Sequence, residues 1–150
     1  MTGAAGDVYE TELRIDARPE TVFGFFTDPA KMVQWKGVDA ALDARPGGVY
    51  RVSVTGRETA IGEYIEVTPY ERIVFTWGWD SGPITPGSTR VEIDLIPDGD
   101  ATILRLRHFG LDAEGRALHK EGWEHYLARL TLAAAGRDAG PDAWVSATPN

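Results

Sequence analysis

The chain has 150 residues, no cysteine and a formal net charge of −8 at pH 7. The lack of cysteine excludes disulfides, thiolate nucleophiles and zinc–thiolate sites. The negative charge disfavours nucleic acid and anionic membrane surfaces as partners. No apolar run approaches the roughly 20 residues that cross a bilayer, and the N-terminus lacks a signal-peptide pattern. We therefore expect one cytoplasmic domain over residues 1–150, with a core at about 8–136 and a tail at 137–150.

The N-terminal part of the sequence predicts one strand and two short helices. Residues 8–15 alternate apolar and polar side chains, which is typical of a strand with one buried face. Pro19 suits the first position of a helix, where a missing N–H costs nothing. Asp28 and Pro29 repeat this signal, because Asp caps a helix and Pro opens it. The second helix is expected to end at Trp35.

Residues 37–109 read as strands joined by turns. A weak strand at 38–43 precedes a clearer one at 49–54, and residues 62–79 form two strands around a tight turn at 68–71. Strands at 89–96 and 101–109 follow a loop at 80–88 that is rich in Gly, Pro and Ser. We leave open whether this loop is a lid. Successive hairpins predict an antiparallel sheet of about seven strands, which must curl.

The last element is a long amphipathic helix at about 113–136, with Asp112 as its cap. No other predicted element could cover the concave face of the sheet, so we expect an α+β fold in which the sheet grips this helix. Its apolar stripe comprises Leu118, Gly122, Trp123, Tyr126, Leu127, Leu130 and Ala134.

Aromatic side chains mark the candidate site. Trp77 and Trp79 share one face of their strand with Ile73 and Phe75, and this face must meet a core, a cavity or a partner. Both tryptophans are either pocket walls that stack on a planar ligand or core residues, with Trp79 closer to the rim.

The presence of Gly122 inside a helix requires an explanation, because Gly destabilises a helix interior by about 1 kcal/mol relative to Ala. It either opens space beside Trp123 or lets the helix pack closely on a strand.

Two polar residues could face the same interior. His108 lies on the face of Leu104 and Leu106, so it is either a satisfied structural residue or a ligand contact and acid–base group. Glu63 lies an even number of residues from Ile61, Ile65 and Val67, so a regular strand would place all four side chains on one face. If Glu63 faces inward, it could contact His108 or Arg51 and form a polar group at the bottom of the cavity. If the strand twists or bulges there, Glu63 is exposed to solvent. His119 and His125 lie six positions apart and do not share a helix face, so no metal site is expected.

Several motifs, none specific alone, occur in an order that resembles the START-like helix-grip superfamily, also called SRPBCC. Within it the chain resembles the group named after the C-terminal domain of the activator of heat-shock-protein ATPase. The resemblance runs from residue 8 to about 135 and rests on Pro19-x-x-Val22-Phe23, Pro29-x-x-Met32-x-x-Trp35, Gly47-Gly48-x-Tyr50, Gly62-Glu63, Pro69-x-x-Arg72-x-Val74-Phe75-Thr76-Trp77, Thr102-x-Leu104-x-Leu106-x-His108 and Gly122-Trp123-x-x-x-Leu127.

The resemblance implies a deep cavity between the sheet and the C-terminal helix, with Trp35 near its mouth. Superfamily members bind lipids, polyketides, hormones and other apolar molecules there, and a minority are cyclases, aromatases or hydrolases. The family name also implies chaperone regulation in a stress response. Because 150 residues leave no room for the N-terminal chaperone-binding domain of the eukaryotic activators, we rank ligand binding first.

Three hypotheses follow. The first is a binding protein for an apolar or aromatic small molecule. The second is an enzyme that uses Glu63 and His108 as an acid–base pair, and the third is a module acting on a chaperone ATPase. No phosphate loop or dinucleotide fingerprint is present, so no cofactor is expected. A homodimer stays open. The expected ligand-binding residues are Trp35, Glu63, Trp77, Trp79, His108, Gly122, Trp123 and Tyr126.

Overall fold

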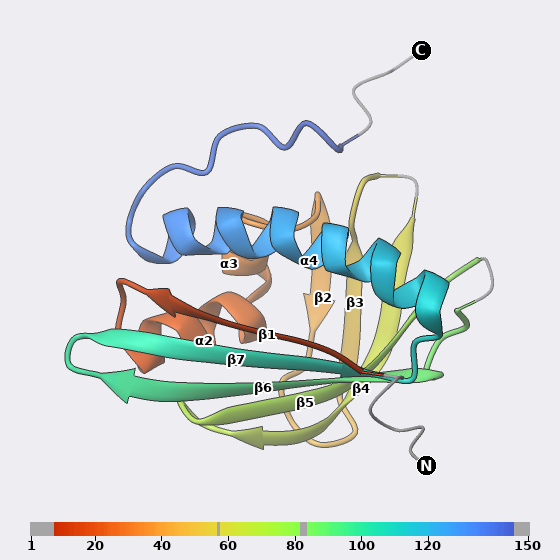
Figure 1. Cartoon of the computed structure of the whole chain (residues 1–150), viewed down its shortest axis with the longest axis horizontal. Coiled ribbons are helices and arrows are strands. Elements are labelled where there is room, and N and C mark those ends of the chain that lie inside the picture. Colours follow the sequence, from red (N-terminus) through yellow and green to blue (C-terminus); the bar gives the residue numbers. More distant parts are fainter. Residues whose placement is uncertain (1–7, 57, 82–83, 146–150) are drawn as a thin grey trace.

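The computed structural model describes residues 8–56, 58–81 and 84–145. The elements follow the expected order of one strand, two short helices, six further strands and a long helix (Figure 1). Their bounds are β1 (Val8–Ile15), α2 (Pro19–Thr27), α3 (Pro29–Met32), β2 (Asp39–Leu42), β3 (Val49–Ser53), β4 (Thr59–Thr68), β5 (Arg72–Trp79), β6 (Thr89–Asp98), β7 (Ala101–Phe109) and α4 (Ala113–Ala134).

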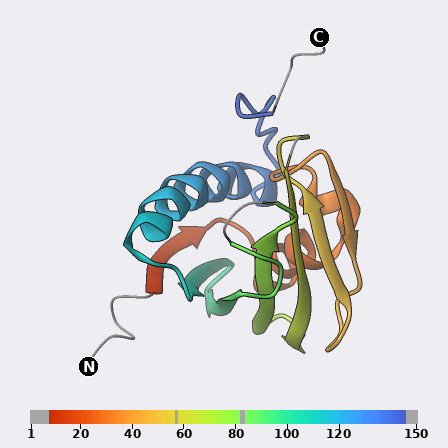
Figure 2. The same cartoon turned by 90° about the vertical axis from the view of Figure 1, so that its right-hand side faces the viewer.

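The strands form one seven-stranded sheet in the order β1-β7-β6-β5-β4-β3-β2. All neighbouring pairs are antiparallel. Figure 2 shows the sheet curling, with α4 lying along its concave side. This is the helix-grip arrangement of the START-like superfamily, and the predicted fold class is confirmed.

The helix starts follow from the residues that precede them. Pro19 opens α2, and a carboxylate oxygen of Asp28 accepts a hydrogen bond from the backbone N–H of Ala30 at 3.0 Å. Asp112 caps α4 as predicted, accepting from the N–H of Gly115 at 2.7 Å. The second short helix ends earlier than expected, at Met32, and residues 33–36 continue as hydrogen-bonded turns.

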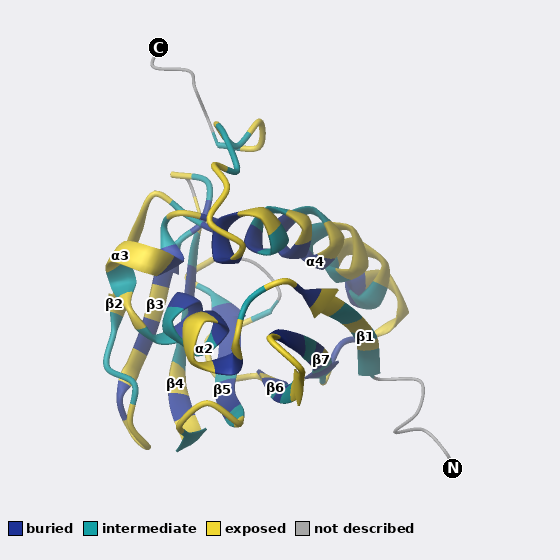
Figure 3. Cartoon of the chain, turned by 90° about the vertical axis from the view of Figure 1, so that its left-hand side faces the viewer, coloured by how far each residue is buried: buried dark blue, intermediate teal, exposed yellow. Residues whose placement is uncertain are grey.

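The core fills the space between the sheet and α4. Figure 3 shows buried segments along β5, β6 and β7, which lie across from the helix, and exposed residues along the outer side of α4. The segment after α4 returns to the helix, where the indole ring of Trp144 stacks on His125 with centroids 3.9 Å apart. The side chain of His125 also bonds Asp142 at 2.7 Å.

The inward prediction for Glu63 is wrong, because β4 bulges. The register with β5 shifts between Tyr64 and Glu66. The inserted residue, Ile65, is 48% exposed, and alternation inverts around it, so Tyr64 is buried and Glu63 exposed. Glu63 therefore faces solvent, as the bulged alternative requires, and the Glu63–His108 acid–base pair is not formed.

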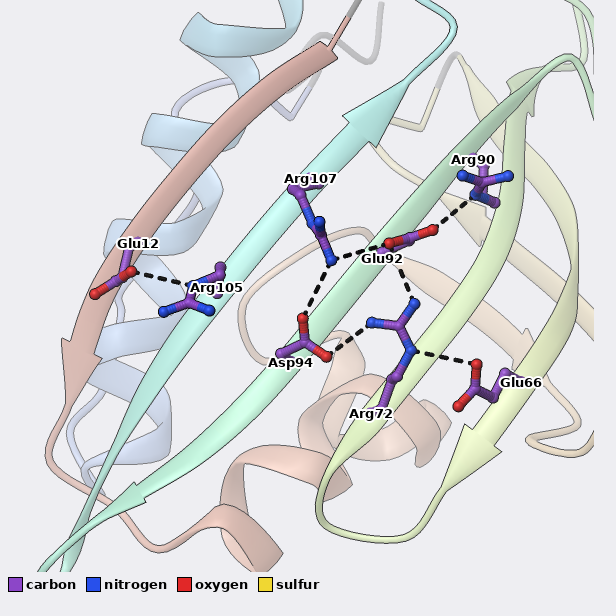
Figure 4. Close-up of polar contacts among 8 residues, drawn as sticks. All are labelled: Glu12, Glu66, Arg72, Arg90, Glu92, Asp94, Arg105 and Arg107. Carbon is purple, nitrogen blue, oxygen red and sulfur yellow. Dashed lines mark hydrogen bonds and ion pairs between the residues drawn. The ribbon is translucent and has the colours of Figure 1, made fainter. Parts of the chain in front are cut away.

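A charged network covers the convex face of the sheet (Figure 4). Glu92 lies at its centre and is only 9% exposed. One carboxylate oxygen of Glu92 forms ion pairs with Arg72 and Arg107, both at 3.2 Å, and the other oxygen pairs with Arg90 at 3.0 Å. Asp94 pairs with Arg72 at 2.8 Å. Since Glu92 is surrounded by three guanidinium groups and shielded from water, its pairs are worth more than those of exposed carboxylates.

Replacing Glu92 with glutamine is expected to lower the free energy of unfolding by about 2 kcal/mol, because the amide keeps the shape but loses the charge that three arginines need. Glu12→Gln is the matched control. Among the described residues Glu12 pairs with Arg105 alone, at 3.2 Å, and both side chains are about half exposed. The expected loss is below about 0.5 kcal/mol. Urea denaturation of the two variants at pH 7 measures both values. Equal losses would contradict the central role of Glu92.

Candidate functional site

A pocket of about 510 Å³ lies beside the first half of α4. Its walls come from α4, the end of β5, the loop that follows β5, the β3–β4 turn and the segment after α4. The lining residues are Lys36, Val54, Thr55, Glu58, Trp77, Trp79, Ser81, Ile84, Leu118, His119, Gly122, Trp123, Tyr126 and Trp144. Predominantly apolar walls with a few polar groups are typical of small-molecule sites.

The aromatic walls come from the two elements that the sequence singled out. Trp77 and Trp79 lie on the concave side of β5, with ring centroids 4.5 Å apart in an edge-to-face arrangement. Trp123 and Tyr126 face them from α4, and both are 4% exposed. With Gly122, the structure thus places five of the eight expected ligand-binding residues around one pocket.

Gly122 lies between these aromatic residues on the pocket side of α4. A Cβ atom built at this position would meet no heavy atom within 4 Å. Close packing of the helix on a strand therefore does not explain this glycine. The missing side chain leaves open space in the pocket, which is the other alternative that the sequence offered.

Lys36 is a pocket residue that sequence reasoning missed. It follows the turn after α3, and Gly37, with φ +92°, turns the chain into β2. The guanidinium group of Arg129 on α4 donates to the carbonyl oxygen of Trp35 at 3.0 Å and holds this junction against the helix. From the sequence alone, a lysine next to an aromatic residue is expected to be exposed to solvent. No local signal could therefore have identified Lys36 as a pocket residue.

The amine of Lys36 is surrounded by aromatic rings. Its Nζ atom lies 4.4 Å from the ring centroid of Trp123 and between 5.8 and 6.0 Å from those of Trp35, Trp77 and Tyr126. Lys36 is 5% exposed and forms no ion pair within the described residues. Burial without a counter-charge lowers the pKa of Lys36 from 10.5 to about 7.

Nε2 of His119 and Nε1 of Trp77, both on the lining, are buried and have no hydrogen-bond partner in the described part of the chain. Nδ1 of His119 donates to the carbonyl oxygen of Gly115 at 2.9 Å. A neutral His119 therefore has a free lone pair on Nε2, and burial lowers its pKa, which favours the neutral form. Buried polar atoms without partners are costly, and a ligand could satisfy these two.

His108 is a structural residue and not a ligand contact. It is completely buried and is not among the described residues that line the pocket. Trp123 donates its indole N–H to Nδ1 at 3.1 Å, so the proton of neutral His108 sits on Nε2 and is donated to the Thr89 hydroxyl at 2.9 Å. That hydroxyl donates to the carbonyl oxygen of Trp77 at 2.6 Å. Burial lowers the pKa of His108 well below 6.5, so the residue stays neutral and positions Trp77 and Trp123.

Trp35 also lies outside the pocket lining. It is 1% exposed, donates its indole N–H to the carbonyl oxygen of Phe25 at 2.9 Å, and packs edge-to-face on Phe26. The expectation that Trp35 lies at the cavity mouth is wrong, because α3 ends early and turns this ring into the core. The neighbouring Lys36 reaches the pocket instead.

Two features are absent from the described residues. No set of three or more His, Cys, Asp or Glu side chains among them is arranged to hold a metal ion. None of their helices is both long and apolar enough to cross a membrane.

Comparison with known proteins identifies relatives of the chain. Residues 16–135 match the model of the family described as Activator of Hsp90 ATPase homolog 1-like protein. A search of curated proteins gave no significant match. Many solved structures are similar, among them an AHSA1-like protein from Rhizobium etli that is 47% identical, with a TM-score of 0.74 over 95% of this chain and 91% of that one.

Two other solved structures extend the comparison. CalU16 from Micromonospora echinospora is 27% identical, with a TM-score of 0.72 over 89% of this chain and 77% of that one. An HSP90 activator from Plasmodium falciparum is 22% identical, with a TM-score of 0.72 over 85% of this chain and 96% of that one, and this likeness concerns the fold alone. Since the family model matches residues 16–135, from α2 to the end of α4, the chain belongs to the Activator of Hsp90 ATPase homolog 1-like family.

Proposed function

We propose that the protein binds a small apolar or aromatic molecule in the pocket beside α4. The observation that carries this proposal is the open volume of about 510 Å³ between the tryptophans of β5 and the aromatic residues of α4. Gly122 supports it, because a helix-destabilising residue keeps this volume free. Apolar contact would supply most of the affinity for such a ligand.

The polar atoms of the lining suggest what else the ligand carries. The indole N–H of Trp77 can donate one hydrogen bond, and Nε2 of His119 can accept one. A ligand with one or two polar groups on an aromatic frame would satisfy both atoms. This refines the expectation from the sequence, with His119 and Lys36 taking the polar role that had been assigned to Glu63 and His108.

The neutral dye N-phenyl-1-naphthylamine tests the proposal, because its fluorescence rises when it enters an apolar site. We expect Gly122→Leu to weaken its binding at least about tenfold, equivalent to about 1.4 kcal/mol, because the added side chain fills the pocket. Ala128→Leu is the matched control, since Ala128 is exposed on the same helix. Absence of binding to the unmodified protein, or equal affinities of the two variants, would contradict the proposal.

Chaperone regulation is the second candidate, and the family's name supports it. The Plasmodium falciparum relative with the same fold is named as an HSP90 activator. An ATPase assay of a purified Hsp90 with and without this protein tests the candidate. Stimulation that survives Gly122→Leu would indicate a surface separate from the pocket, and no stimulation would remove this function.

A further inference from the structure

We propose that Lys36 is a nucleophilic residue that captures neutral aldehydes or ketones as an imine inside the aromatic pocket. This inference deepens the proposed binding function by naming the ligand class and a covalent step. It rests on the position of Nζ, 4.4 Å from the ring centroid of Trp123 in a pocket that can hold a ligand. Lysine amines react with carbonyl carbons when they are held unprotonated in an apolar site.

Lys36 meets this requirement through its surroundings. No carboxylate forms an ion pair with it in the described part of the chain, and four aromatic rings stand around Nζ. Although the faces of these rings attract an ammonium group, burial without a counter-charge lowers the pKa of Lys36 to about 7. A large fraction of Lys36 is then a free amine at neutral pH.

The step balances without an oxidant or reductant. The lone pair of Nζ attacks the carbonyl carbon, and the C=O π electrons move to oxygen, which gains a proton while nitrogen loses one. The carbinolamine hydroxyl then takes a proton and leaves as water while the nitrogen lone pair forms the C=N bond, and the iminium nitrogen gives up its remaining proton, which replaces the one that the hydroxyl took. The products are one imine and one water molecule. His119 can carry the proton from nitrogen to oxygen, because Nε2 has a free lone pair and lines the same pocket.

A neutral carbonyl compound fits this site better than an anion. An anionic ligand would face the lone pair of His119, the Glu58 carboxylate on the lining and a chain with a net charge of −8. A carbonyl compound brings no charge, and the aromatic walls that would exclude water also slow hydrolysis of the imine.

The test uses 2-naphthaldehyde with cyanoborohydride, which reduces an imine to a stable amine. The chain has three lysines, and Lys31 and Lys120 are exposed, so they serve as internal controls. Peptide mapping by mass spectrometry at pH 7 should show Lys36 modified at least about tenfold faster than the other two, because only Lys36 is held in the aromatic pocket. Comparable rates at all three lysines, or no modification of Lys36, would overturn the proposal.

Variants separate the roles of the residues. Lys36→Met should lose modification at position 36 while Lys31 and Lys120 react as before. His119→Asn should slow modification of Lys36 several-fold yet leave its pH midpoint near that of the unmodified protein, since His119 is assigned proton transfer and not amine activation. The groups that face Lys36 are His108 on β7, His119 and Tyr126 on α4, and Glu58 in the turn before β4. An unchanged rate in His119→Asn would remove the proton-transfer role.

Two further probes distinguish this proposal from the binding function on which it rests. The alcohol 2-naphthylmethanol lacks the carbonyl group and reports binding alone by calorimetry. If the alcohol binds but the aldehyde does not modify Lys36, the covalent proposal fails and the binding function stands. If 2-naphthoate binds in a Lys36-dependent manner and the aldehyde does not react, Lys36 is an anion contact. If neither the alcohol nor the aldehyde binds, both proposals fail.

Discussion

Replacing Lys36 with methionine will raise the free energy of unfolding by roughly 2–3 kcal/mol at pH 7, and the gain will shrink as the pH rises toward 9.5. The folded protein holds Lys36 with a pKa of about 7, against 10.5 for an ordinary lysine. Between these values the unfolded chain keeps the proton and the folded protein has lost it. Raising the pH through this window therefore stabilises the unmodified protein by up to about 1.4 kcal/mol per pH unit. Methionine has no such dependence.

Urea denaturation of both proteins at pH 7, 8 and 9.5 measures this difference. Burial lowers the pKa of His108 and His119, so both histidines are neutral throughout the window and do not obscure it. Burial raises the pKa of Tyr50 and Tyr64, and their ionisation lies above the window. Lys31→Met is the control, because Lys31 is exposed. A gain that is constant with pH would show that Lys36 is charged in the folded protein.

Replacing His108 with alanine will lower the free energy of unfolding by about 3–5 kcal/mol. The change leaves a cavity in the core, removes the acceptor of the Trp123 indole N–H and removes the donor to the Thr89 hydroxyl, which keeps its hydrogen bond to the carbonyl oxygen of Trp77. The expected effect is large because all these groups are buried and cannot turn to water. The hydrogen bonds through His108 and Thr89 hold both Trp77 and Trp123 in place. The pocket walls should therefore become more mobile as well.

Denaturation curves and indole hydrogen exchange measure the two effects. Thr89→Val breaks only the link from His108 to the carbonyl oxygen of Trp77 and should cost about 1–3 kcal/mol. The Trp123 indole proton should exchange faster in His108→Ala than in Thr89→Val, because only the first change removes its acceptor. A loss below about 1 kcal/mol in His108→Ala would contradict a structural role for this residue.

The order of elements could be predicted because each depends on neighbours in the sequence. Alternation on β5 and β6 follows from the two-residue period of a strand, and Pro19, Asp28 and Asp112 act on the first turns of their own helices. The aromatic face of β5 and the stripe of α4 were apparent for the same reason. These local rules placed Trp77 and Trp79 on one face of a strand and Trp123 and Tyr126 on one stripe of a helix, and the resemblance to the helix-grip superfamily implied the cavity where the structure brings them together.

The polar part of the site could not be predicted, because it depends on contacts between distant residues. The direction of Glu63 was inferred from its parity with Ile61, Ile65 and Val67. The strand bulges at Ile65, and one inserted residue inverts every side chain beyond it, so Val67 and Glu63 lie on opposite faces. The role of His108 depends on Trp123 and Thr89 meeting it from two other elements.

The sequence by itself therefore determined the curled sheet, the gripped helix and the aromatic faces, because periodicity and capping act over a few residues. Only the tertiary structure decided which polar groups enter the pocket. Lys36 becomes a buried amine because Arg129 ties the turn after α3 to α4, and Gly122 becomes open space because no neighbour approaches it. Burial and separation in space set the charge and reactivity of such groups, and neither is visible in the order of residues along the chain.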